Sequence, residues 1–172
     1  MPSNRQSPGA HATGSMGSAE IAALVHRARE FKRTADAGLL QPLLRGKTFG
    51  VLHGADADTA EAANDDVTLF GRAAVELGAR VAHLRPALTA ASPVPEVQQT
   101  ARLLGRLYDA VFCDGVDAGV VERLRASAGV PVHDRITAPD HQVSKIADQL
   151  DPSATLAERQ CLALQAVLTS TV

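Results

Sequence analysis

The sequence has few aromatic residues and almost no imbalance of charge. Its 172 residues include no Trp, one Tyr and four Phe, and the formal net charge is −2. Single-stranded bases stack on aromatic side chains, and phosphate backbones are drawn to basic surfaces, so nucleic acid is not an expected partner. No apolar run approaches the roughly 20 residues that cross a bilayer, so no membrane partner is expected either.

Cysteine is scarce too, and the common motifs for catalysis and nucleotide binding are missing. The two cysteines, Cys113 and Cys161, show neither a disulfide framework nor the spacing of metal ligands. The sequence contains no glycine-rich dinucleotide loop, no P-loop, no nucleophile elbow and no CxxC pair. We therefore expect reduced thiols, a cytoplasmic location and no cofactor.

The composition otherwise is that of one globular domain. Hydrophobic residues make up 45% of the chain and charged residues 21%, which is typical of proteins that bury a single core. Residues 1–14 are rich in Ser, Pro, Gly and Ala and lack the apolar stretch of a secretion signal. We expect a disordered tail over 1–14 and one α/β domain over 15–172.

Short apolar runs alternate with helical patterns along that domain. The runs predict strands at 48–52, 81–84, 110–113 and 130–133, and Pro131 favours an edge position for the last one. Apolar residues at helical spacing predict helices over 21–31, 67–77, 97–108, 120–128, 143–150 and 156–171. This alternation predicts a three-layer α/β/α fold around a four-stranded parallel sheet.

Polar residues follow the predicted strands, where ligands bind in sheets of this kind. His53 follows the first strand, His133 and Arg135 lie at the end of the fourth, and His141 begins the next helix. The ligand-binding candidates are His53, Asn64, Asp65, His133, Arg135 and His141.

Six short strings, in chain order, resemble those of the aspartate and ornithine carbamoyltransferases. They are LRGKTF at 44–49, AAVELG at 73–78, TARLL at 100–104, AGVPV at 128–132, PDH with IADQL within 139–150, and ERQCLALQAVL at 158–168. The resemblance implies the carbamoyl-phosphate half of such an enzyme, with a closing helix that packs on the same domain. It also implies transferase ancestry and a homotrimer. A mixed assembly with a full-length paralogue is the alternative.

Two departures from the family pattern argue against carbamoyl transfer. The family's phosphate-binding string, Ser-Thr-Arg-Thr-Arg, falls here on 63–67, which reads Ala-Asn-Asp-Asp-Val. Five carboxylates and no Lys or Arg lie between residues 53 and 66, and each would repel a nearby phosphate by a few kcal/mol at ~5 Å and an effective dielectric constant of ~20. The second-substrate domain is also missing between residue 150 and the closing helix. We therefore expect a binding, scaffold or regulatory subunit without transferase activity.

Two other functions are left open by the residues. One is a divergent enzyme that acts on a less anionic small molecule, with His53, His133 or His141 in acid–base roles. The other is a metal-dependent activity at the acidic edge, with His53, Asp56 and His133 as weak ligand candidates. Purely structural roles are the alternatives to ligand binding: His141 begins a helix, Arg135 forms an ion pair, and the acidic loop caps a helix. Cys113 is a weak candidate for a nucleophile.

Overall fold

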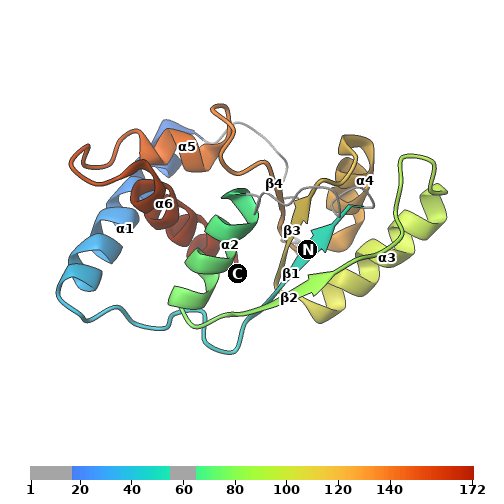
Figure 1. Cartoon of the computed structure of the whole chain (residues 1–172), viewed down its shortest axis with the longest axis horizontal. Coiled ribbons are helices and arrows are strands. Elements are labelled where there is room, and N and C mark those ends of the chain that lie inside the picture. The colour runs from blue at the N-terminus through green and yellow to red at the C-terminus, as the bar shows by residue number, and fades with distance from the viewer. Residues whose placement is uncertain (1–16, 55–64) are drawn as a thin grey trace, which may run out of the picture.

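The computed structural model describes residues 17–54 and 65–172, and within them a parallel four-stranded sheet lies between two layers of helices (Figure 1). The strands are β1 (Thr48–His53), β2 (Arg80–Leu84), β3 (Ala110–Asp114) and β4 (Val132–Asp134), in the order β2-β1-β3-β4. One face carries α1 (Ser18–Asp36), α2 (Asp65–Glu76), α5 (Gln142–Ala147) and α6 (Leu156–Thr171), and the other carries α3 (Val94–Leu107) and α4 (Ala118–Ala128). The predicted three-layer fold is confirmed. The expected tail over 1–14 lies outside the described residues.

Local sequence signals account for most of the element ends. A capping box begins α6: Glu158 accepts the amide hydrogen of Thr155, and Thr155 Oγ1 accepts that of Glu158. At the start of α1, Glu20 accepts the amide hydrogen of Gly17, which has no side chain to complete such a box. Asp117 caps α4, and Gly129 ends it in the left-handed conformation. The prediction for the fourth strand was wrong at both ends: β4 begins at Val132, since Pro131 has no amide hydrogen for the ladder. Its edge position is confirmed.

The strand register decides which side chains meet. In the ladder, Val51 of β1 pairs with Phe112 of β3 and with His83 of β2, and Phe112 pairs with His133 of β4. Side chains of paired residues project from the same face of a sheet. Val51 and Phe112 pack in the larger core under α1, α2 and α6, so this is the face that also carries the two histidines.

The C-terminal helix α6 closes the larger core as predicted, packing on α1, α2 and α5. Its buried Gln165 donates from Nε2 to Glu76 Oε2 of α2 at 2.8 Å. Residues 148–155 are the whole link between α5 and α6. No helix among residues 17–54 and 65–172 is long and apolar enough to cross a membrane.

The contact between α3 and α4 depends on a glycine. A Cβ on Gly105 would lie 1.8 Å from the carbonyl oxygen of Ala128. We expect Gly105→Ala to lower the free energy of unfolding by about 1–3 kcal/mol, because one helix must move away from the other. Urea denaturation measures this change.

Gly71, in the interior of α2, is the matched control. A Cβ on Gly71 would meet nothing within 4 Å, so Gly71→Ala should raise stability by about 0.5–1 kcal/mol through helix propensity alone. Equal effects of the two substitutions would contradict the proposed close packing of α3 on α4.

Candidate functional site at the carboxyl edge of the sheet

Three polar side chains form a chain of contacts across β3, β1 and β2. His53 Nδ1 lies 2.9 Å from Asp114 Oδ2, and His53 Nε2 lies 2.9 Å from His83 Nδ1. The two imidazole rings lie edge to edge and nearly coplanar, with centroids 5.2 Å apart and an interplanar angle of 13°. Asp114 is buried and the side chain of His53 is 14% exposed, whereas His83 is exposed. The contacts therefore run from a buried carboxylate to a solvent-facing imidazole.

His133 lies deeper than the sequence suggested. It is 7% exposed and packs its ring near Phe70 of α2, with ring centroids 6.5 Å apart. Its Nε2 is buried without a hydrogen-bond partner among the described residues. Burial, assisted by the charges of His141 and Arg125, lowers the pKa of His133 to about 4, although Asp134 opposes the shift. His133 is therefore a neutral, buried residue at pH 7, and its Nε2 is not accessible to a substrate.

His141 begins α5, and its side chain caps that helix. Its Nδ1 accepts the amide hydrogen of Val143 at 3.2 Å, which leaves Nε2 to carry the ring proton. Burial lowers the pKa of His141, while Asp134, Asp66 and Asp140 act in the opposite direction. The geometry matches the helix-start role, and it keeps one N–H of the ring as a potential donor.

Two carboxylates stand at the start of α2. Asp65 is exposed, and Asp66 is buried, where its Oδ1 accepts the amide hydrogen of Thr137 at 3.2 Å. This bond joins α2 to the segment that follows β4. Asn64 and Asp56, both named as candidates, lie outside the described residues.

Two basic side chains, Lys47 and Arg72, are ion-paired away from the start of α2. Lys47 pairs with Asp109 at 3.1 Å, at the amino end of the sheet. Arg72 pairs with Glu76 at 2.7 Å, one turn from the end of α2. The described start of α2 therefore offers carboxylates, and neither Lys47 nor Arg72 reaches it.

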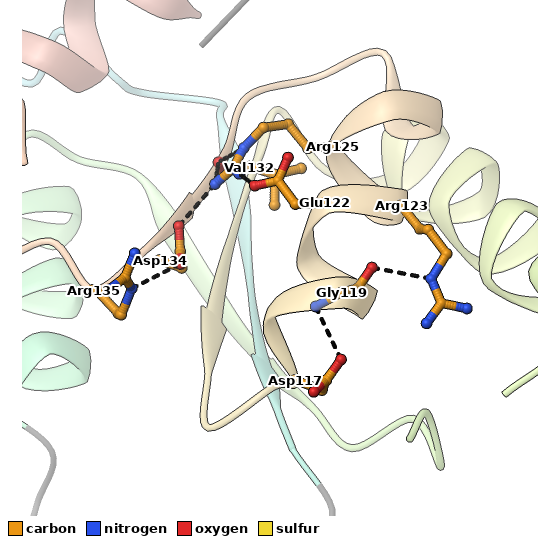
Figure 2. Close-up of polar contacts among 8 residues, drawn as sticks. All are labelled: Asp117, Gly119, Glu122, Arg123, Arg125, Val132, Asp134 and Arg135. Atoms are coloured by element: carbon orange, nitrogen blue, oxygen red, sulfur yellow. Dashed lines mark hydrogen bonds and ion pairs between the residues drawn. The ribbon is translucent and has the colours of Figure 1, made fainter. Parts of the chain in front are cut away.

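The end of β4 is held by arginine contacts (Figure 2). Arg125 of α4 donates to Asp134 Oδ1 at 2.7 Å and to the carbonyl oxygen of Val132, and it also contacts Glu122. Arg123, two residues earlier on the same helix, donates to the carbonyl oxygen of Ser92 at 3.1 Å. Arg125 therefore joins α4 to β4, and Arg123 joins α4 to the segment that precedes α3.

Arg135 follows β4 with a backbone φ of +43°, the one positive φ at a non-glycine residue of the described chain. Its side chain is 78% exposed and its Nε lies 3.3 Å from Asp134 Oδ2. This is the solvated, ion-paired arrangement considered among the alternatives. A left-handed residue directly after a strand is a local strain of about 1–2 kcal/mol.

Cys113 is not a nucleophile. It is 4% exposed, and burial raises the pKa of its thiol to about 12, with the charge of Asp134 adding to the shift. The thiolate that would attack a substrate is therefore absent near pH 7.

The metal-site hypothesis finds no ligand cluster in the described part of the chain. No group of three or more His, Cys, Asp or Glu there is placed to hold a metal ion. Of the weak candidates, His53 contacts Asp114 and His83, and His133 is buried in the core.

Sequence reasoning missed two members of the contact chain, His83 and Asp114, as site residues. His83 reads as the penultimate residue of an apolar strand, and Asp114 reads as the start of a loop. The available signal was the alternation of side chains in the second strand, which puts His83 on the same face as the core residue Val81.

The fold and the polar carboxyl edge define a class: a parallel three-layer α/β domain with its functional groups beyond the ends of the strands. The ornithine carbamoyltransferase of Cutibacterium acnes is 34% identical over 131 residues, which are 76% of this chain and 37% of that protein. The catabolic ornithine carbamoyltransferase 1 of Staphylococcus epidermidis is 31% identical over 137 residues, covering 80% of this chain and 40% of the relative. No family model matches the sequence.

Solved structures agree with these relatives. The ornithine carbamoyltransferase of Pyrococcus furiosus superposes with a TM-score of 0.59 at 26% identity, over 76% of this chain and 40% of that one. The catalytic subunit of M. jannaschii aspartate transcarbamoylase gives a TM-score of 0.57 at 20% identity, over 77% of this chain and 42% of that one, which shows a shared fold. The chain belongs to the ornithine/aspartate carbamoyltransferase family, and it spans about two fifths of the length of these relatives.

Burial of His133 predicts a loss of stability in acid. The unfolded chain protonates this imidazole near pH 6.5, whereas the folded chain resists protonation down to about pH 4. The unfolded state therefore binds more protons in this window, and stability falls as the pH drops below about 6.5, by about 2 kcal/mol at about pH 5. Urea denaturation at about pH 7 and about pH 5 should show that His133→Leu loses most of this difference.

His26→Gln is the control, because His26 is exposed on α1. A small acid dependence will persist in the His133 variant, since burial also lowers the pKa of His141. An unchanged acid dependence in His133→Leu would show that His133 is not the buried neutral group.

Proposed function

We propose that this chain is a carbamoyltransferase-family domain that does not transfer carbamoyl groups by itself and serves as a binding, scaffold or regulatory subunit. The observation that carries the proposal is the start of α2, where Asp65 is exposed and Asp66 is buried. The family resemblance puts the phosphate of carbamoyl phosphate at this helix start.

Electrostatics at that position disfavour a phosphate. A helix N-terminus offers a dianion only about half a positive charge. Two carboxylates within about 5 Å outweigh it, since each costs a few kcal/mol at an effective dielectric constant of about 20. Because Lys47 and Arg72 are ion-paired away from the start of α2, neither offsets this repulsion.

The link between α5 and α6 supports the same proposal. The resemblance implies that a second-substrate domain stands at this point of the chain in complete transferases. Here residues 148–155 join α5 directly to α6, and the two helices pack against each other. Transfer of a group between two reactants requires that both reactants be held in one geometry. Residues 148–155 are too few to form a second domain that would bind the other reactant.

We further propose that the chain assembles into a homotrimer or joins a full-length paralogue. The family relationship supports association. So do Leu103 and Leu107, which stand one turn apart on α3 with 54% and 58% of their surface exposed.

Calorimetric titration with carbamoyl phosphate tests the central proposal. We expect no saturable heat up to about millimolar ligand at low ionic strength, a condition that favours weak anion binding. Inorganic phosphate is the control for non-specific anion effects.

A saturable heat with carbamoyl phosphate would contradict the proposal if His141→Asn removed it. Asparagine can keep the cap of α5 by accepting the amide hydrogen of Val143, so the variant separates ligand contact from helix stability.

Light scattering after size-exclusion chromatography tests the assembly. We expect a mass of three 18.0 kDa chains for the purified protein. A monomer that stays monomeric on mixing with a complete carbamoyltransferase would contradict both forms of the proposed assembly.

A further inference from the structure

We infer that Asp114, His53 and His83 form a proton relay that makes the carboxyl edge an acid–base site for a neutral small molecule with an ionisable proton. This inference goes beyond the proposed binding or scaffold role and does not depend on it. It assigns His83 as the catalytic residue, with His53 and Asp114 as positioning residues.

The contact distances determine where the protons sit. A carboxylate only accepts hydrogen bonds, so His53 must carry its proton on Nδ1, which faces Asp114 Oδ2 at 2.9 Å. Neutral His53 then has a lone pair on Nε2, which must accept from His83 Nδ1 at 2.9 Å. His83 is left with a lone pair on Nε2. Because His83 is exposed, this basic nitrogen belongs to the solvent-facing member of the relay.

The strand register holds this arrangement in place. His53 pairs directly with Asp114 in the ladder, and His83 pairs with Val51, two residues before His53. All three side chains therefore project from the same face of the sheet. Gly54, next to His53, donates its amide hydrogen to the carbonyl oxygen of Asp114 at 2.8 Å and extends the pairing beyond the strand.

The geometry fits hydrogen bonding better than joint metal ligation. Two imidazole nitrogens bound to one zinc ion at about 2.0–2.1 Å in tetrahedral geometry lie about 3.3 Å apart. The observed 2.9 Å between His53 Nε2 and His83 Nδ1 is instead the ordinary length of an N–H···N contact. The metal alternative therefore gains no support from these two residues.

The relay can take up one proton and return it. A substrate X–H bond breaks as its proton passes to His83 Nε2, and the electron pair stays on X. The Nδ1 proton of His83 then moves to His53 Nε2, which leaves His83 neutral and His53 as an imidazolium beside the Asp114 carboxylate. Opposite charges at 2.9 Å stabilise this state. The reverse movement returns the proton to the product, so no other reactant is consumed.

A nitrobenzisoxazole is a suitable probe of a positioned base. Removal of the proton on C3 of its isoxazole ring forms a nitrile as the N–O bond breaks, and the ring-opened product is a coloured cyano-nitrophenolate that is measured by absorbance. We expect the full chain to open this ring about 10²-fold faster than imidazole at equal concentration. His83→Gln should remove at least about nine-tenths of that rate; because His83 is exposed, the variant should fold normally.

His26→Gln provides a matched control. His26 is an exposed imidazole next to a carboxylate, Glu30, at 3.5 Å, but no second histidine of residues 17–54 and 65–172 is bonded to it. We expect this variant to keep the full rate. A rate equal to that of imidazole, an equal loss in the two variants, or a loss on addition of EDTA would overturn the inference.

Long-range proton–nitrogen NMR spectra test the positioning roles without relying on activity. At about pH 8, both His53 and His83 should carry their ring proton on Nδ1, the less populated neutral form of free histidine in water. Asp114→Asn should change the protonated nitrogen of His53 or mix its two forms. Protonation of either ring on Nε2 in the unmodified protein would overturn the relay.

Discussion

Parallel pairing of β1 with β2 on one side and β3 on the other is the constraint on which both the core and the carboxyl edge depend. It puts Phe49 and Val51 into the larger core under α2 and α6, and it puts His53 at the end of the same row, beside Asp114. A slip of one residue would turn His53 to the face of α3 and α4 and break its contact with Asp114. The hydrophobic pattern that specifies the register therefore also specifies the polar site.

The helical layer on that face stabilises the arrangement but leaves some polar groups under strain. Gln165 of α6 and Arg72 of α2 both donate to Glu76 of α2, and the Gln165 bond holds the closing helix against α2. His133, in contrast, is buried with no hydrogen-bond partner for its Nε2 within the described part of the chain, and Arg135 has a left-handed backbone. Both residues belong to the end of β4, so the domain bears a free-energy cost close to the edge where ligands bind in this class of fold.

At the carboxyl edge of the sheet, the family of this chain and its own side chains suggest different functions. The relatives are carbamoyltransferases, and the chain has their fold over about three quarters of its length. Its start of α2 is nevertheless acidic, and its strand ends bring two histidines and an aspartate into contact. An inherited scaffold with altered side chains at the strand ends is how one fold comes to support different chemistry.

The sequence by itself determined the order of helices and strands, the four-stranded parallel sheet and the edge position of β4, because apolar periodicity and capping residues are local signals. The family was indicated by the resemblance of six short strings. The sequence also placed His53 and His141 at element ends. Only the tertiary structure decided that His133 is buried, that Cys113 keeps its proton, and that His83 and Asp114 join His53. The physical reason is that pKa values and side-chain contacts depend on strand order and register, which bring together residues 30 and 61 positions apart in the chain.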